Sequence, residues 1–313
     1  MIAIPPTFKN EPVTNDVRQP ADVGAYLSET AIHERPSETK VNKPTSVKSR
    51  HLGLYFATAA VRRAGQWLPP IVALLSLVVV WELVCRLMGV KEYLLPAPTR
   101  VASVMYSKLD LLVFDSLITL VEAAMGFGLA FFLAFTISLT FTYFRLLERA
   151  LMPYLVAFQA VPIIAIAPLL VLWSGNGLLG KVIMAAIICF FPAVVSITRG
   201  LRSVNPDALT LMHSLSASPL QILFKLRVPS SLPFVFAAMR ISATLSVIGA
   251  LVAEISGAKR GIGFRIVISS YRTDTTLLFA ALMFSIVLGL VFYGTMVLIE
   301  AVIRRYRPVG HNL

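Results

Sequence analysis

Six apolar segments, each long enough for a membrane-spanning helix, constrain the fold of this chain more than any other feature. They cover residues 67–88, 116–143, 150–173, 178–197, 234–257 and 277–303. A helix needs about 20 mostly apolar residues to cross the hydrocarbon core of a bilayer. The composition agrees, because 57% of the residues are hydrophobic and only 14% are charged, against about 45–50% and about 25% in soluble domains. The sequence therefore predicts an all-α polytopic membrane protein with about six transmembrane helices.

The net charge of +12 does not indicate a nucleic-acid partner. The Lys and Arg residues flank the apolar segments and do not form one face, which is typical of membrane proteins. If all six segments span, thirteen of these cations lie on the side of the N-terminus and eight on the other side. Since cytoplasmic loops are enriched in Lys and Arg, we expect both termini in the cytoplasm. The few His and Cys residues are far apart, so no metal site is expected.

The chain is predicted to consist of two tails and one transmembrane domain. Residues 1–50 are polar and contain six prolines, so we expect a disordered cytoplasmic tail. Residues 51–66 fit either an interfacial helix or an extension of the first span. The transmembrane domain covers residues 67–307, and residues 308–313 form a C-terminal tail.

The segment 204–233, between the fourth and fifth apolar segments, carries two signals for the start of a helix. Asn205 is expected to cap a first helix with Pro206 and Asp207 in its first turn, and Ser218 before Pro219 repeats the signal. The apolar residues of the first helix recur at helical spacing and form one stripe. They are Ala208, Leu211, Met212 and Leu215.

Pro229 and Pro233 are expected to end the second of these short helices. The segment then contains two amphipathic helices, at about 206–217 and 219–227. A connection between two spans does not require such helices, so they predict a docking element for a soluble partner on the cytoplasmic side.

The stretch 175–182, GNGLLGKV, nearly matches the phosphate-binding P-loop pattern, but we reject that interpretation. Val182 stands where a Ser or Thr would hold magnesium, and no strand precedes the stretch. If the protein uses ATP, another chain has to bind it.

Ionisable residues within apolar segments are costly to bury, so each requires a partner or a function. Glu82 and Arg86 are four residues apart, which predicts an ion pair on one helix face. Glu122 is isolated in the sequence. Glu254 is expected either to pair with Lys259 or Arg260 or to line an outward-facing vestibule.

Other polar residues in the third and fifth segments have two explanations, helix packing or a substrate path. Arg240, at the cytoplasmic end of the fifth segment, is expected to extend toward the membrane surface. The candidates for a substrate path are Gln159, Pro162, Ser242, Thr244, Ser246 and Glu254.

The segment 204–233 resembles the EAA loop of the permeases of binding-protein-dependent ABC importers. In that family a Glu-Ala-Ala triplet, three residues, a Gly, nine residues, an aliphatic residue, one further residue and Leu-Pro mark the cytoplasmic coupling helices. Here the triplet position is 210–212, the Gly position is Ser216, the aliphatic position is Leu226, and Val228 and Pro229 end the pattern. The spacing is kept, although the Glu and the Gly are absent.

Further blocks extend this resemblance over residues 70–305. LLPAPTRV at 94–101, VPIIAIAPLLVLWSGNG at 161–177 and VIGALVAEISGAKRGIGF at 247–264 are similar to the nitrate, sulfonate and taurine branch of these permeases. LTLMHSLSAS and LLFAALMFSIVLGL are similar to permeases for pyrimidine precursors and riboflavin. The resemblance leaves the substrate open between these heterocycles and nitrate, sulfonate or taurine.

The resemblance implies the type I ABC importer permease fold in a bacterial inner membrane. It implies a homodimer surrounded by membrane lipid, two ABC ATPase subunits and an extracytoplasmic solute-binding protein. ATP and magnesium would bind to the ATPase, so no catalytic site or cofactor is expected on this chain. Asp207 or His213 would replace the missing Glu. The residues expected to couple to the ATPase are Asp207, Leu211, Met212, Leu215, Ser216, Ala217, Ser218, Gln221 and Pro229.

Two other classes of function predict different features in the sequence. An ion-coupled secondary transporter predicts interrupted helices, paired intramembrane carboxylates and an inverted repeat, and the sequence contains no clear repeat. A polytopic membrane enzyme requires a cluster such as His with Asp or Glu on one membrane face. Asp207 and His213 are six residues apart, which places them on different sides of a helix.

Overall fold

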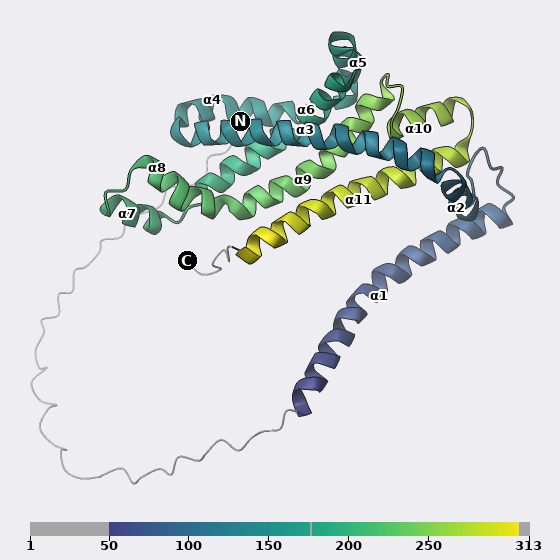
Figure 1. Cartoon of the computed structure of the whole chain (residues 1–313), viewed down its shortest axis with the longest axis horizontal. Coiled ribbons are helices and arrows are strands. Elements are labelled where there is room, and N and C mark those ends of the chain that lie inside the picture. Colours follow the sequence, from purple (N-terminus) through teal and green to yellow (C-terminus); the bar gives the residue numbers. More distant parts are fainter. Residues whose placement is uncertain (1–49, 176, 307–313) are drawn as a thin grey trace, which may run out of the picture. The chain divides into compact units, whose positions relative to one another are not determined.

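The structure of the protein is a computed structural model that describes residues 50–175 and 177–306. The described residues form helices and no strand, as Figure 1 shows. The predicted tails, 1–50 and 308–313, lie outside this part of the chain except for Arg50, which begins a helix. The chain divides into two compact units, Met1–Gln66 and Trp67–Leu313, and the contacts below all belong to the second unit.

Five of the six predicted spans are continuous helices. They are α1 (Arg50–Leu87), α3 (Leu109–Tyr143), α6 (Leu178–Arg202), α9 (Val228–Ile255) and α11 (Thr275–Tyr306). Each contains a stretch that is long and apolar enough to cross a membrane. Helix α1 continues without a break through residues 51–66, and an interfacial location for that part remains a prediction.

The third predicted span is not one continuous helix. It consists of α4 (Arg145–Phe158) and α5 (Ile163–Ser174), which meet at an angle of 98°. Figure 1 shows α5 turning away from the direction of α4. Pro162 precedes α5 directly. Proline has no N–H and excludes the preceding residue from helical geometry, which explains why the helix ends there.

The fifth span begins earlier than predicted, because Pro229 and Pro233 do not end a helix. The helical chain is continuous through α8 (Pro219–Ile222), the π-helix η1 (Leu223–Arg227) and α9. Pro229 lies in the first turn of α9, directly after η1. A π-turn widens the helix and shifts the hydrogen-bond register, so the proline ring avoids the carbonyl group with which it would otherwise clash.

Three further helices complete the described chain. The short helix α2 (Pro98–Ser107) precedes α3, and α7 (Pro206–Ser214) lies between α6 and α8. Helix α10 (Ile262–Tyr271) is apolar and has ten residues, which is too short to span a bilayer. The sequence did not predict α10.

Small residues allow α3, α6 and α9 to pack closely. A side-chain carbon on Gly249 of α9 would lie 2.6 Å from the Cα atom of Ala185 on α6. Gly126 of α3 has no room for a side chain beside the same alanine. In the absence of a strong hydrophobic force between helices in lipid, such close contacts hold a bundle together.

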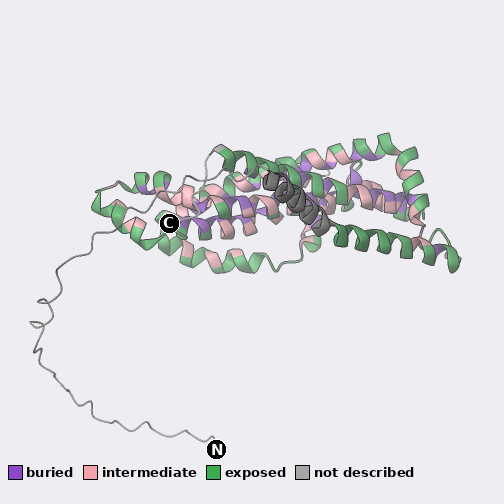
Figure 2. Ribbon diagram, turned by 90° about the horizontal axis from the view of Figure 1, so that it is seen from below, coloured by how far each residue is buried: buried purple, intermediate pink, exposed green. Residues whose placement is uncertain are grey.

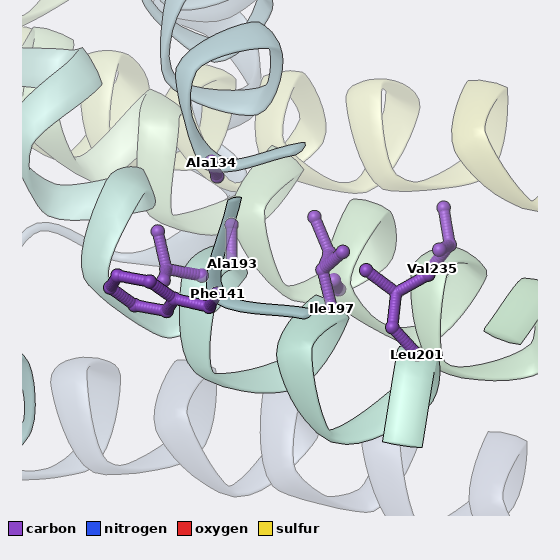
Figure 3. Packing of buried hydrophobic residues seen from close by; sticks show 8 residues of the cluster. Ala134, Phe141, Ala193, Ile197, Leu201 and Val235 are labelled. Atoms are coloured by element: carbon purple, nitrogen blue, oxygen red, sulfur yellow. The ribbon is translucent and has the colours of Figure 1, made fainter. Parts of the chain in front are cut away.

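Larger side chains pack between the same three helices farther toward the C-terminal end of α6 (Figure 3). The cluster includes Ala134 and Phe141 of α3, Ile197 and Leu201 of α6 and Val235 of α9. Figure 2 shows the buried residues concentrated along these helices, whereas the part of α1 whose burial is described is almost entirely exposed. The rigid part of the molecule is therefore the α3–α6–α9 bundle. Two groups of functional candidates, one near α7 and one near α10, lie at its two ends.

Candidate functional site

The loop between α6 and α9 forms the first predicted short helix, α7, and the start of the second, which continues without a break into α9. The Asn205 side chain accepts a hydrogen bond of 2.9 Å from the backbone N–H of Asp207, which caps α7. The Ser218 hydroxyl accepts one from the backbone N–H of Gln221, and the Gln221 side chain accepts one from the backbone N–H of Ser218. Both predicted caps are confirmed, and the second is a complete capping box.

A tight turn at Ser216 joins the two helices. Ser216 has a φ of 54°, in the left-handed region that favours glycine. The N–H groups of Leu215, Ser216 and Ala217 all donate to carbonyl oxygens of the last turns of α7. The left-handed geometry explains why the EAA loop has glycine at the corresponding position.

Large apolar side chains are exposed on both short helices. Leu211 is 60% exposed and Leu215 is 69% exposed, while Met212 and Ala217 are half-buried. The sequence singled out this stripe on α7 but missed Leu220 and Phe224, each 62% exposed, on the second helix. Exposed apolar groups of this size indicate a binding surface when they occur together outside a spanning segment, as Leu211 and Leu215 do. We call Leu211, Leu215, Leu220 and Phe224 the loop surface.

A groove of about 410 Å³ separates the short helices from the end of α3. It is lined by Tyr143 of α3, His213 of α7 and Arg227 of η1, among others. Asp207 and His213 are both exposed; His213 lines this groove, and Asp207 lies at the start of α7. Which of the two replaces the family glutamate remains a prediction. Pro229, also predicted to couple, is half-buried in the first turn of α9.

Ion pairs connect this end of the bundle to the neighbouring helices. Arg202, at the end of α6, pairs with Glu148 of α4. Glu300 of α11 is buried and lies 2.7 Å from Arg304 and 3.4 Å from Arg240 of α9. The guanidinium group of Arg240 bridges α9 and α11, and its extension toward the membrane surface remains a prediction.

The opposite end of the bundle contains a buried charge network. Glu254 of α9 accepts hydrogen bonds from the Thr119 hydroxyl at 2.7 Å and from the backbone N–H of Gly263 at 2.6 Å. The expected pairing of Glu254 with Lys259 or Arg260 is wrong, because the glycine-rich turn into α10 brings Gly261 and Gly263 against the carboxylate instead.

Two ion pairs complete this network. Glu122 of α3 lies 2.6 Å from Lys181 of α6, and Asp115 of α3 lies 2.7 Å from Arg265 of α10. The predicted pair of Glu82 and Arg86 is confirmed at 2.6 Å, but it is separate and mostly exposed at the arginine.

Three acids and two bases from α3, α6, α9 and α10 thus meet in one place. Buried charges are stabilised by partners with good geometry. Lys181 and Arg265 pair with Glu122 and Asp115, and Glu254 is held by hydrogen bonds from Thr119 and Gly263. Glu122 and Glu254, isolated in the sequence, belong to the same cluster. The sequence missed Asp115, Lys181 and Arg265 because no local pattern links residues so far apart.

The candidates for a substrate path fall into two groups in the structure. Ser242, Ser246 and Glu254 are buried, and the Ser242 side chain contacts the backbone of α6 at Cys189. Gln159, Pro162 and Thr244 are exposed in the single chain. The first two lie in the break between α4 and α5, and a path role for the whole set remains a prediction.

Comparison with known proteins identifies a protein family that this chain matches. Residues 126–305 match the family described as "Binding-protein-dependent transport system inner membrane component". The formylaminopyrimidine transport permease protein ThiX of Halalkalibacterium halodurans is 37% identical over 65% of this chain and 82% of its own length. The riboflavin transport system permease protein RibX of Chloroflexus aurantiacus is 35% identical over 75% of this chain and 88% of its own length.

A more distant relative and one solved structure agree with that match. The putative aliphatic sulfonates transport permease protein SsuC of Bacillus subtilis is 26% identical over 79% of this chain and 90% of its own length. A chain of the inward-facing MetNI methionine ABC transporter superposes with a TM-score of 0.56, covering 66% of this chain and 99% of that chain at 17% identity. The structural likeness supports the type I importer fold.

Proposed function

Because the chain belongs to the family of binding-protein-dependent transport system inner membrane components, we propose that it is the permease subunit of an ABC importer for a nitrogen heterocycle. The observation that supports the coupling role is the loop surface, four exposed apolar side chains on two capped helices. Permeases of this family are not enzymes, and ATP is hydrolysed by a separate subunit. The other partners are an extracytoplasmic binding protein and a second copy of this chain.

The loop surface is suited to a groove on a cytoplasmic ATPase. Leu211 and Leu215 project from a helix that is capped at one end and joined to α8 by the turn at Ser216. Because α8, η1 and α9 are continuous, a push on the short helices is transmitted directly into the fifth span. The Arg240–Glu300 contact passes the movement to α11, so the spans move as near-rigid bodies between inward-open and outward-open states.

The names of the relatives support one class of solute. Those that are 35–37% identical are named for riboflavin and formylaminopyrimidine, both nitrogen heterocycles, while the one named for sulfonates is 26% identical. We therefore favour a heterocycle over nitrate, a sulfonate or taurine. A ligand screen on the binding protein encoded with this chain tests the choice, and tight binding of an oxyanion in place of a heterocycle would reject it.

Replacing both Leu211 and Met212 with Asp tests the coupling role. Two buried apolar side chains contribute about 1.5–3 kcal/mol each to a helix-in-groove contact, so the variant should no longer co-purify with the ATPase. The permease itself should keep its elution volume in detergent, because Leu211 is exposed and Met212 only half-buried. Replacing exposed Leu290 of α11 with Ala is the matched control. A normal complex with the double variant would contradict the assignment.

An ion-coupled secondary transporter is the alternative. Such a transporter also predicts an interrupted span, as in α4 and α5, and interacting carboxylates, as in Glu122 and Glu254. The family match nevertheless supports the importer. Uptake into proteoliposomes separates the two. The importer requires ATP hydrolysis and the binding protein, whereas uptake driven by an ion gradient alone would establish the alternative.

A further inference from the structure

Three arginines from three different helix ends gather at the end of the bundle that carries α7 and α8. Arg145 begins α4, Arg202 ends α6, and Arg227 is the last residue of η1. Figure 1 shows that α4 begins at this end of the bundle. The charges of Arg145 and Arg227 both act on Arg202, so both lie within electrostatic reach of it. We call these three residues the arginine cluster.

The arginine cluster carries more positive charge than its neighbours in the described part of the chain balance. Of its three members only Arg202 has an acidic partner there, which is Glu148 of α4. The Arg227 side chain donates instead to the backbone carbonyl of Leu201. Cations commonly flank membrane spans, but that tendency does not require them to gather in one place, where they repel each other. An anion beside the cluster would offset this repulsion.

An apolar surface adjoins the arginine cluster. Phe144 is 64% exposed and Leu146 is 83% exposed, and they flank Arg145 in the sequence. Both line a shallow hollow of about 570 Å³ whose lining residues carry no charge. Tyr143 and Arg227 line the groove of about 410 Å³ described above. The end of α3 and the start of α4 thus adjoin a groove that contains an arginine and a hollow that is apolar.

The cluster lies at the level of a phospholipid headgroup. Tyr143 ends α3 and Arg202 ends α6, the second and fourth of the predicted spans, so residues at these ends reach a surface of the membrane. A headgroup phosphate at that level accepts hydrogen bonds from arginine, and its acyl chains continue beside apolar side chains. Basic pockets between transmembrane helices bind anionic headgroups in this manner.

We propose that the arginine cluster and the apolar hollow form a binding site for an anionic phospholipid. The phosphate lies at Arg145 and Arg227, and the acyl chains lie against Phe144 and Leu146. The lipid balances the charge that Glu148 leaves, and it joins the start of α4 to η1, from which the fifth span continues. The site does not depend on the importer function, since it requires only that this end of the bundle lies at a membrane surface.

Lipid binding to the full chain, purified in a neutral detergent with its ATPase and without it, tests the site. Native mass spectrometry compares phosphatidylglycerol with phosphatidylcholine of the same acyl chains. One variant combines Arg145→Gln with Arg227→Gln, and a second replaces both arginines with Lys and keeps the charge. The matched control, Lys259→Gln with Arg272→Gln, removes two exposed cations from the opposite end of the bundle.

The natural chain should bind phosphatidylglycerol more tightly than phosphatidylcholine. The double Gln variant should lose about thirtyfold in affinity for phosphatidylglycerol, since each cation near a membrane surface contributes about fivefold toward an anionic headgroup. The Lys variant and the control should keep most of the affinity. Equal binding of the two lipids, or a control that loses as much as the double Gln variant, would overturn the site.

The headgroup without acyl chains, glycerophosphoglycerol, distinguishes a lipid from a free phosphate ester. As a competitor it should bind at least about a hundredfold more weakly than the lipid, because burial of four CH₂ groups alone contributes about that factor. Leu146→Ser should weaken binding of the lipid and leave binding of the headgroup unchanged. Equally tight binding of the headgroup and the lipid would overturn the assignment to a phospholipid.

Co-purification with the ATPase distinguishes a lipid site from a protein contact. The double Gln variant should still recruit the ATPase, because its loop surface is intact, and Arg145→Gln alone should lose about fivefold in lipid affinity if the double variant does not fold. Loss of the ATPase with unchanged lipid binding would overturn the site. The expected lipid binding in a chain that recruits no ATPase would support the site and reject the importer alone.

Discussion

The two ends of the α3–α6–α9 bundle are built in opposite ways. The end with α7 and α8 is shaped by local contacts, since its caps at Asn205 and Ser218 join residues two or three positions apart. The other end is held by the charge network, in which Glu122 and Lys181 are 59 positions apart. The first end is exposed and can engage another protein, whereas the second fixes four helices to each other.

The largest effect should come from removing one member of the charge network. Lys181→Met leaves Glu122 as a buried charge without its partner, and breaking such a pair costs about 3–5 kcal/mol. We expect a large drop in the unfolding temperature of the purified protein in detergent.

A second variant separates charge from packing at this position. Glu122→Gln together with Lys181→Met removes the unpaired charge and should recover most of the loss, since replacing both members of a buried pair is often neutral. Lys259→Met, on an exposed residue, is the matched control. If Lys181→Met is as stable as the control, the network is not the rigid end of the bundle.

A smaller effect is expected at the locally built end. Ser218→Ala removes the capping box of α8 and should cost about 1 kcal/mol of helix stability. Because α8 is exposed, the loss should appear mainly as weaker binding of the ATPase and hardly at all in the unfolding temperature. Ser203→Ala is a suitable control, as that hydroxyl bonds only within its own turn. A drop in unfolding temperature as large as that of Lys181→Met would contradict the contrast between the two ends.

The smallest expected effect is a gain. Ser216→Gly relieves a left-handed residue, which costs a non-glycine residue about 1–2 kcal/mol, while glycine loses about 0.5–1 kcal/mol through its greater freedom in the unfolded chain. A net stabilisation of up to about 1 kcal/mol should be visible in chemical denaturation of the α7–α8 region followed by hydrogen exchange. Ser214→Gly, within α7, should be destabilising, and equal effects of the two changes would show that the turn is not strained.

The sequence predicted the fold well where each element depends on its own residues. Five spans were located from apolar length alone, because a helix in lipid must be apolar over about 20 residues wherever its neighbours lie. The third span was predicted as one helix, since its apolar length is sufficient and the effect of Pro162 depends on what lies beside it. Pro229 was predicted to end a helix, but the helix continues past it, because a π-turn accommodates the proline.

The candidate sites divide in the same manner. The caps and the α7 stripe were read directly from spacing, because a cap joins residues two or three positions apart. The partner of Glu254 was predicted from its neighbours in sequence, Lys259 and Arg260, and the structure places Thr119 and Gly263 there instead. No sequence pattern encodes which residue of α3 faces the turn after α9.

The amino-acid sequence by itself determined the membrane environment, the location of five spans, the two caps of the loop and the resemblance to a transporter family. Each of these depends on composition or on residues within one or two helical turns. Only the tertiary structure decided which buried charges neutralise each other and where the third span bends. Those outcomes depend on how close the helices lie to each other and on which backbone groups stay without a hydrogen bond between them. Both are defined only after the helices have packed.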